Sequence, residues 1–153
     1  MTLLEVIKNI EWVASQQPVI HSIVRNDVFR LNALPDARYS VFAWLQGEHR
    51  AALEADLLTY AFTFFYVDRL TFDKGNEVEI QSTGIETLEN ILRVLAEHGI
   101  VAGDHSFRTF NEKFADECAG VYCTLTLEVP KDTMCDIDFG DYNNDFNNDF
   151  SIY

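Results

Sequence analysis

Basic residues are scarce in this sequence. Its 153 residues include 11 Lys and Arg against 25 Asp and Glu, which gives a formal net charge of −14 with neutral histidines. A protein that binds duplex nucleic acid needs clustered basic side chains to displace the counterions of the phosphates. Here the basic residues are scattered, so neither specific DNA binding nor docking to an anionic membrane is expected. An acidic surface still lets DNA pass close by without sticking to it.

Cysteine is also scarce, and its spacing predicts neither a disulfide framework nor a zinc site. The three cysteines, Cys118, Cys123 and Cys135, are odd in number and form no Cys-x-x-Cys pair. Free thiols in a reducing compartment are therefore expected. Cys123 lies in an alternating apolar run, where we expect it to behave as a small core residue.

Long apolar runs are missing as well. No stretch approaches the ~18 apolar residues of a membrane span, and residues 1–5 lack the basic and apolar regions of a signal peptide. We therefore expect a protein made in the cytoplasm, without a membrane anchor. The length of 153 residues favours one domain, and the hydrophobic content of 48% is ordinary for a globular core.

Signatures of catalysis and metal binding are absent from the sequence. The four histidines lack metal-ligand spacing, no serine lies in a Gly-x-Ser-x-Gly context, and no glycines form a phosphate loop. Asp136, Asp138 and Asp141 resemble part of a calcium loop, but the fifth position is Gly140 and the twelfth is Asn147. We expect no enzyme, no cofactor and no metal site. An enzyme with a ferredoxin-like fold would need a pocket of convergent polar groups.

Hydrophobic periodicity predicts two helices. Residues 2–16 carry apolar side chains at helical spacing, and Thr2 and Glu5 fit a capping box at their start. Residues 77–98 carry a second apolar stripe, which Gly99 would close as a C-cap.

Two other segments are less regular. Residues 19–38 are apolar without clean periodicity, which favours an extended, partly buried segment. Residues 78–80 belong either to the second helix or to an extended lead-in, the latter if Thr83 and Glu86 cap the helix instead.

The remaining apolar runs predict four strands and a polar hairpin loop at 47–56. The strands are expected at residues 39–46, 57–70, 106–114 and 120–129. Residues 57–70 are apolar on both faces, so both must be covered, and their aromatic row 60–66 is expected in the core more than at an interface. The predicted class is α+β, in the order α-β-β-α-β-β. Its four-stranded antiparallel sheet has the helices packed on one face and its edges open to a neighbour.

The sequence changes character after Pro130. This change divides it into a domain of residues 1–130 and an extended C-terminal arm of residues 131–153. The arm carries six aspartates, no basic residue after Lys131 and a repeated Asn-Asn-Asp-Phe. Acidic segments are often disordered, but the regular aromatics here favour an arm that docks onto another subunit. The candidate interface residues are Phe139, Tyr142, Phe146, Phe150 and Tyr153.

Three segments of the domain resemble a family of phage structural proteins. They are residues 65–70 (FYVDRL), 79–86 (EIQSTGIE) and 114–120 (FADECAG). Together with the predicted element order, they resemble the tail-terminator and tail-completion proteins of tailed bacteriophages, especially small structural proteins of Bacteroides and crAss-like phages. The resemblance covers about residues 2–130 and brings no active site with it.

This resemblance implies a structural virion protein. Members of the family form homo-oligomeric rings at the head-to-tail junction, below the portal, where they cap or connect the tail tube. The chain is then expected in the neck or tail of the virion, as a ring of about six or about twelve copies. Its neighbours would be other neck, portal and tail proteins, and DNA would pass through the channel without specific binding.

The residues alone leave a second function open. A small, non-enzymatic adaptor or binding module would use the acidic C-terminal tail to recruit a partner. Assembly that depends on residues 131–153 would favour the ring, whereas a gene neighbourhood without portal and capsid genes would favour the adaptor.

Overall fold

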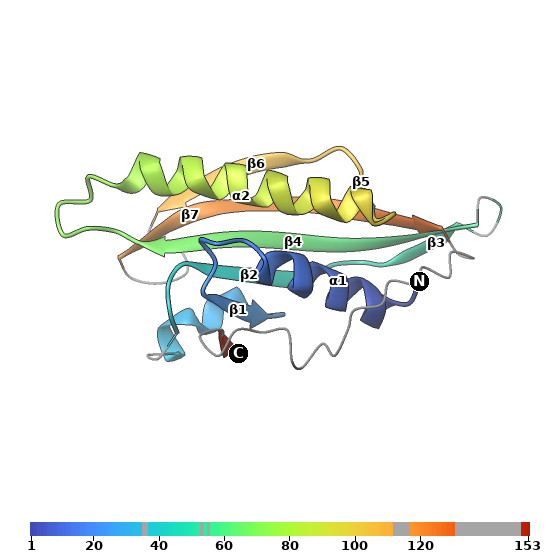
Figure 1. The fold of residues 1–153 in the computed structure, drawn as a ribbon, viewed down its shortest axis with the longest axis horizontal. Coiled ribbons are helices and arrows are strands. Elements are labelled where there is room, and N and C mark those ends of the chain that lie inside the picture. The colour runs from blue at the N-terminus through green and yellow to red at the C-terminus, as the bar shows by residue number, and fades with distance from the viewer. Residues whose placement is uncertain (35–36, 53, 55, 112–116, 131–150) are drawn as a thin grey trace.

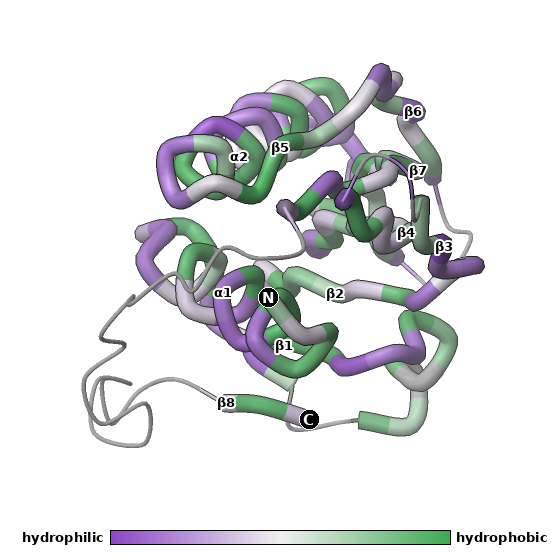
Figure 2. The backbone as a smooth tube through the Cα atoms, turned by 90° about the vertical axis from the view of Figure 1, so that its right-hand side faces the viewer, coloured by the Kyte–Doolittle hydropathy of each residue, from purple (hydrophilic) through white to green (hydrophobic). Residues whose placement is uncertain are grey.

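The computed structural model of the chain describes residues 1–34, 37–52, 54, 56–111, 117–130 and 151–153. Within these residues, two helices pack on one face of a long mixed sheet of eight strands (Figure 1). The predicted α+β class is confirmed, and so is the packing of both helices on one face. Figure 2 shows the two helices next to each other on the same side of the strands.

The first helix, α1, spans Leu3–Ser15, close to the predicted 2–16. Its start is fixed by the predicted capping box. The Thr2 hydroxyl accepts a hydrogen bond from the backbone N–H of Glu5 (3.2 Å), and the Thr2 N–H donates to the Glu5 carboxylate (2.6 Å). These hydrogen bonds from Thr2 hold the pKa of Glu5 below its ordinary value.

The second helix, α2, spans Glu77–Glu97. Because it begins at Glu77, the alternative of an extended lead-in at 78–80 is wrong. The helix ends at Glu97 with His98 as its C-cap, one residue before the predicted Gly99, whose φ of 80° lies in the left-handed region that favours glycine. The N–H of Ile100 then donates to the carbonyl of Leu95 (3.0 Å) and closes the last turn.

The sheet has the strand order β5-β7-β4-β2-β1-β8, with β3 also paired to β4 and β6 also paired to β7. The strands are β1 Ser22–Arg25, β2 Val41–Gln46, β3 Arg50–Ala52, β4 Leu57–Arg69, β5 Val101–Ala102, β6 Ser106–Asn111, β7 Cys118–Pro130 and β8 Ser151–Ile152.

The predicted four-stranded antiparallel sheet is wrong in extent. Strands β2, β4, β7 and β6 do pair antiparallel in that order. However, β1 adds in parallel beside β2, and β8 adds in parallel beside β1, so the sheet is mixed. Pairing between segments distant in the sequence leaves no local pattern, which is why these two strands were not predicted.

Three local predictions also need correction or a limit. Residues 19–38 contain β1 and a 3-10 helix, η1 (Val28–Ala33), rather than one extended segment. The predicted loop 47–56 contains the short strand β3. Strand β6 ends at Asn111 in the described part of the chain, and the predicted continuation to residue 114 lies outside it.

The main core lies between the helices and the sheet. The predicted aromatic row on β4 belongs to it, since Tyr60, Phe62, Phe64 and Tyr66 are all buried. The rings of Phe42 and Phe64 meet edge to face at 5.3 Å, a favourable arrangement for aromatic pairs.

A second, smaller core lies on the opposite face of the sheet. It joins Phe65 and Val67 of β4 with Val28 and Leu31 of η1. It covers the C-terminal half of β4. Thr59, Ala61 and Thr63, in the N-terminal half, are half-exposed, so the expectation that both faces of this strand are fully covered is met for one half.

Candidate assembly surfaces

The segments that carry the family resemblance meet at one end of the molecule. Residues 65–70 finish β4, residues 79–86 lie in the first half of α2, and residues 117–120, the described part of the third segment, begin β7. The end of β4 pairs directly with the beginning of β7. We call this end, from which the β4–α2 loop projects in Figure 1, the β4/β7 corner.

Two glycines let the elements of the β4/β7 corner approach closely. A Cβ added to Gly84 of α2 would lie 2.8 Å from the Tyr66 ring and 2.9 Å from Val121. A Cβ on Gly120 would lie 1.8 Å from the Tyr66 carbonyl oxygen, a distance no real pair of atoms adopts. Both positions therefore need glycine, because a larger residue would push α2 and β7 away from Tyr66.

A buried polar network ties the corner to β2. The Tyr66 hydroxyl donates to the Ser40 hydroxyl oxygen (3.0 Å), which in turn donates to the Asp68 carboxylate (3.0 Å). Burial raises the pKa of Tyr66 above its ordinary value, so its proton stays in place. Ser40 is 6% exposed, so the network lies inside the protein, where it joins the start of β2 to the end of β4.

The nearby thiol is equally inert. Burial raises the pKa of Tyr39 to about 12, helped by a hydrogen bond to the sulfur of Cys118. Burial also raises the pKa of Cys118 itself, whereas a reactive thiol needs a lowered one. The Arg69 guanidinium lies 4.7 Å from the centre of the Tyr39 ring, where cation and ring attract each other.

The loop that leaves the corner is held by its own side chains. The N–H of Thr71 donates to the Asn76 side-chain oxygen (2.8 Å), and the Asn76 amide donates back to the Arg69 carbonyl (3.1 Å). The Asp73 carboxylate accepts from the Thr71 hydroxyl (2.7 Å) and the Gly75 N–H (3.1 Å). These bonds, first that of Thr71, lower the pKa of Asp73. They also preorganise the loop, so a group displayed on it costs little entropy to bind.

What this loop displays is Phe72. Its side chain is completely exposed, at 107% of the reference value, and Val78 in the first turn of α2 is 75% exposed. A single exposed apolar side chain is ordinary on a protein surface. A phenyl ring held out by an ordered loop, with a second apolar residue nearby in the chain, instead favours a contact with another protein, where aromatic anchors contribute most.

The second surface is the sheet edge at β1, which holds the end of the predicted arm. Strand β8 pairs in parallel with β1, and the N–H of Tyr153 donates to the Ile23 carbonyl (2.9 Å). The N–H of Arg25 donates to the Tyr153 carbonyl (3.0 Å), and the Tyr153 side chain packs against the second core. We call the Ile23 and Arg25 backbone groups the β1 seat.

Of the five aromatics predicted as interface residues, the structure places Tyr153, on the β1 seat of its own chain. Phe139, Tyr142, Phe146 and Phe150 lie outside the described residues. The docking of these side chains onto another subunit therefore stays a prediction.

An ion pair with a buried carboxylate joins the β1 seat to α1. The Arg25 side chain donates two hydrogen bonds, both of 2.6 Å, to the carboxylate of Glu11 on α1. The indole N–H of Trp44 on β2 donates to the same carboxylate (3.1 Å), and the Glu11 side chain is 1% exposed. One carboxylate thus joins α1, β1 and β2. Sequence reasoning missed it, although an acidic residue on the apolar side of an amphipathic helix was a usable signal.

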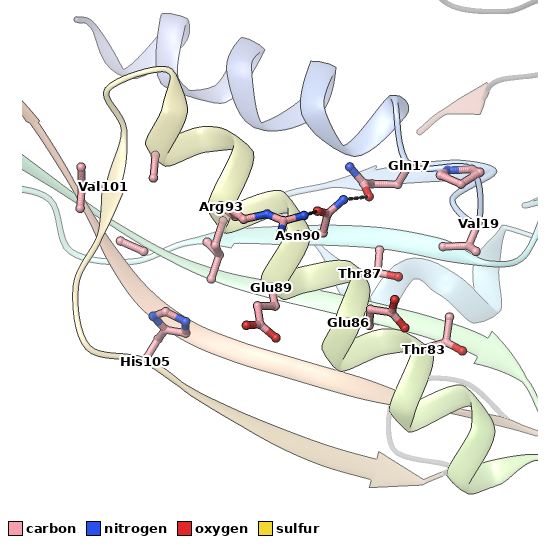
Figure 3. A pocket seen from close by; sticks show the side chains of 14 residues that line it. Gln17, Val19, Thr83, Glu86, Thr87, Glu89, Asn90, Arg93, Val101 and His105 are labelled. Carbon is pink, nitrogen blue, oxygen red and sulfur yellow. Dashed lines mark hydrogen bonds between the residues drawn. The ribbon is translucent and has the colours of Figure 1, made fainter.

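The structure also has a hollow of about 790 Å³ along the outer side of α2, open to solvent (Figure 3). Its polar side chains bond to one another: Arg93 donates to the Asn90 side-chain oxygen, and Asn90 donates to that of Gln17 (2.8 Å). His105 is paired with the Gly103 carbonyl (2.8 Å). The hydrogen bond between Asn90 and Gln17 therefore ties α2 to the end of α1.

In the described part of the chain, no group of three or more His, Cys, Asp or Glu side chains is arranged to hold a metal ion. Among the same residues, no helix has the length and apolar character needed to cross a membrane.

Comparison with known proteins does not identify the chain. The sequence matches no model of a known protein family, and no curated protein matches it significantly.

Proposed function

We propose that this chain is a structural, non-enzymatic protein of a phage particle, where it forms a homo-oligomeric ring at the head-to-tail junction. It is made in the host cytoplasm and is then built into the neck or tail of the virion. The observation that carries the proposal is the place of Phe72. This fully exposed ring stands on an ordered loop at the β4/β7 corner, the end formed by the segments that resemble phage ring proteins.

Charge supports the same role. The chain carries 25 acidic and 11 basic residues, and a wall of this charge repels phosphate. DNA would therefore slide through such a ring without being held.

Size favours the smaller of the two expected rings. Subunits of this length that pack side by side, across the long axis of β4, would lie ~35 Å apart. About six such subunits in a closed ring leave a central channel ~35 Å wide, whereas about twelve leave a channel of ~100 Å. The narrower channel suits a single DNA duplex, and the wider one would need additional parts to line it.

A ring also needs two different surfaces, because rotational symmetry repeats one heterologous contact until it closes. The sheet offers unlike edges for this purpose. Among the described residues, one edge is formed by the antiparallel strands β5 and β6, and the other by the parallel strand β8. The Phe72 loop adds a third feature, at the end of the sheet rather than along an edge.

The first test is quantitative mass spectrometry of purified particles from the source, with copies scaled to the portal protein. We expect the chain in the particles, at a small fixed ratio to the portal. Absence from particles, together with soluble protein in the host, would refute the virion role and favour the adaptor module.

The second test concerns the contact itself. Phe72→Ser is expected to shift the purified full-length chain from ring to monomer in native mass spectrometry, with an unchanged melting temperature. Phe29→Ser is the matched control, because Phe29 is also exposed, at 66%, but lies on η1. Equal assembly of the two variants and the unaltered chain would show that the β4/β7 corner is not an assembly contact.

A further inference from the structure

We propose that, in the ring, β8 of each subunit pairs with the β1 seat of the neighbouring subunit, so that residues 151–153 are exchanged from copy to copy. This inference rests on the proposed ring, and its occupant is a second copy of the same chain.

The β1 seat can bind residues 151–153 of any copy of this chain. Its recognition groups are the carbonyl of Ile23 and the N–H of Arg25, which bond to the backbone of Tyr153. Backbone hydrogen bonds of this kind supply affinity when a strand is added to a sheet edge. The ion pair between Arg25 and Glu11 holds the edge in place from inside the same chain, so the seat keeps its shape whichever copy supplies the strand.

Side chains give the seat its register. Ile152 is paired with Ile23 and therefore lies on the same side of the sheet as that residue of the main core. Tyr153, the next residue, packs on the opposite side, against the second core. A slip by one residue would interchange the two sides, so the Ile-Tyr pair specifies how the strand is seated.

The chain before β8 is longer than its own seat requires. Ser151 lies level with Val67, and Pro130 lies level with Leu57, so the two ends are ten residue steps apart along the sheet. Ten steps of ~3.3 Å separate the two residues along the strands, and four strand spacings of ~4.8 Å, from β7 to β8, separate them across the sheet. Combined at right angles, these distances place Pro130 ~38 Å from Ser151. Residues 131–150 span up to ~69 Å when extended. A neighbour's seat that is displaced by ~35 Å at right angles to this span lies ~52 Å from Pro130 and is therefore within reach.

Exchange preserves every contact that β8 makes. In a closed ring each seat is filled once and each strand is used once, so the exchanged and unexchanged forms have the same strand pairings. The difference lies in residues 131–150, whose four aromatics pass a neighbour's surface in the exchanged form. Because subunits in a ring hold neighbouring seats at high effective concentration, exchange requires no extra affinity in the seat itself.

The test is a disulfide across the strand pair. Ser22 and Ser151 are register partners, and paired strands hold such Cα atoms ~4.8 Å apart, within the range that a disulfide accepts. The full-length chain would carry S22C and S151C, with Cys135→Ser to remove the thiol between them. It would be assembled, oxidised and run on a denaturing gel without reductant.

The expected result is a ladder of covalently linked chains that extends to the full ring and collapses to monomer on reduction. A mixture of two chains, one with S22C and the other with S151C, is expected to give linked dimers. Cys135→Ser alone is the matched control and is expected to stay monomeric on the same gel.

The outcomes separate this inference from the proposed function. Intact rings in native mass spectrometry that contain single chains closed on themselves, or no cross-link at all, would refute exchange and leave the ring standing. Failure to form rings, with each chain cross-linked to itself, would refute both.

Discussion

The buried carboxylate of Glu11 provides a sharp test of how the domain is held together. In Glu11→Ala, Arg25 loses both of its 2.6 Å bonds and the Trp44 indole N–H loses its acceptor. Breaking a buried ion pair typically costs about 3–5 kcal/mol of the free energy of unfolding. The Arg25 side chain is 44% exposed and can be hydrated afterwards, which places this contribution at about 3 kcal/mol.

The indole N–H adds to that loss. Trp44 is 4% exposed, and a buried donor left without an acceptor costs at least about 1 kcal/mol. The total is therefore about 4 kcal/mol, which corresponds to a fall in melting temperature of roughly 8–16 °C for a domain of this size. Urea denaturation followed by circular dichroism measures the change.

Two matched variants identify the cause. Glu11→Met combined with Arg25→Met is expected to lose much less than Glu11→Ala, because no buried charge or cavity of similar size remains. Glu89→Ala removes a carboxylate from the exposed side of α2 and is expected to change stability by less than about 0.5 kcal/mol. A loss below about 1 kcal/mol in Glu11→Ala would refute the reasoning, because the carboxylate would then not be the tie between α1, β1 and β2.

Three further predictions concern the corner and its thiols. Gly120→Ala, whose Cβ would lie 1.8 Å from the Tyr66 carbonyl, is expected to lower the free energy of unfolding by about 3 kcal/mol or more in urea denaturation, and a loss under about 1 kcal/mol would contradict the packing. Cys118 and Cys123 are expected to resist iodoacetamide at pH 8 and to react in urea, because burial raises the pKa of both thiols, to about 11 for Cys123. Rapid labelling of either cysteine in the native protein, measured by mass spectrometry, would contradict this. The folded protein favours the neutral, protonated forms of Cys123 and Tyr39, because burial raises their pKa values from 9.0 to about 11 and from 10.0 to about 12. The stability that these groups confer is therefore complete below their ordinary pKa values and is lost as the pH rises through the raised ones. A free energy of unfolding that stays flat from pH 8 to pH 10.5 would refute this prediction.

Local patterns in the sequence were sufficient for the helices. The capping box at Thr2 and Glu5 and the left-handed Gly99 each act within one turn, so the sequence predicts α1 and the end of α2 to within a residue or two. The start of α2 is less certain from sequence because Asn76 makes no side-chain cap, and the Thr83 and Glu86 pattern offered a later start that the structure does not use.

Long-range pairing decided what the sequence could not predict. Strand β1 is four residues long and β8 is two, and their mutual pairing joins Ser22 to Ser151 across most of the chain. Neither strand is long enough for its alternation to stand out, and the parallel partner of each is set by tertiary structure. The same holds for Glu11: the helix pattern places it near the apolar side, but which arginine and which indole meet it depends on the fold.

The candidate surfaces divide in the same way. The aromatic arm was visible in composition, and Tyr153 is the part of it that the structure places. Phe72 was not singled out, because a phenylalanine between a predicted strand and a predicted helix reveals nothing of its exposure. Its importance depends on the hydrogen bonds of Asp73 and Asn76, which keep the ring outside the protein instead of folding it onto the core.

The asymmetry of the sheet connects the fold with the proposed assembly. An antiparallel sheet of β2, β4, β7 and β6 has two edges of the same kind, which would favour pairing of like edges between two copies. Strands β1 and β8 add in parallel beside β2, so this edge differs from the other one. The outermost strand, β8, is also separated in the sequence from the rest of the sheet by residues 131–150. One edge of the sheet is then completed by β8, the strand that we propose is exchanged between copies, whereas β6 at the other edge is a largely exposed strand. Contacts between unlike surfaces repeat in one direction, which is the property a closed ring requires.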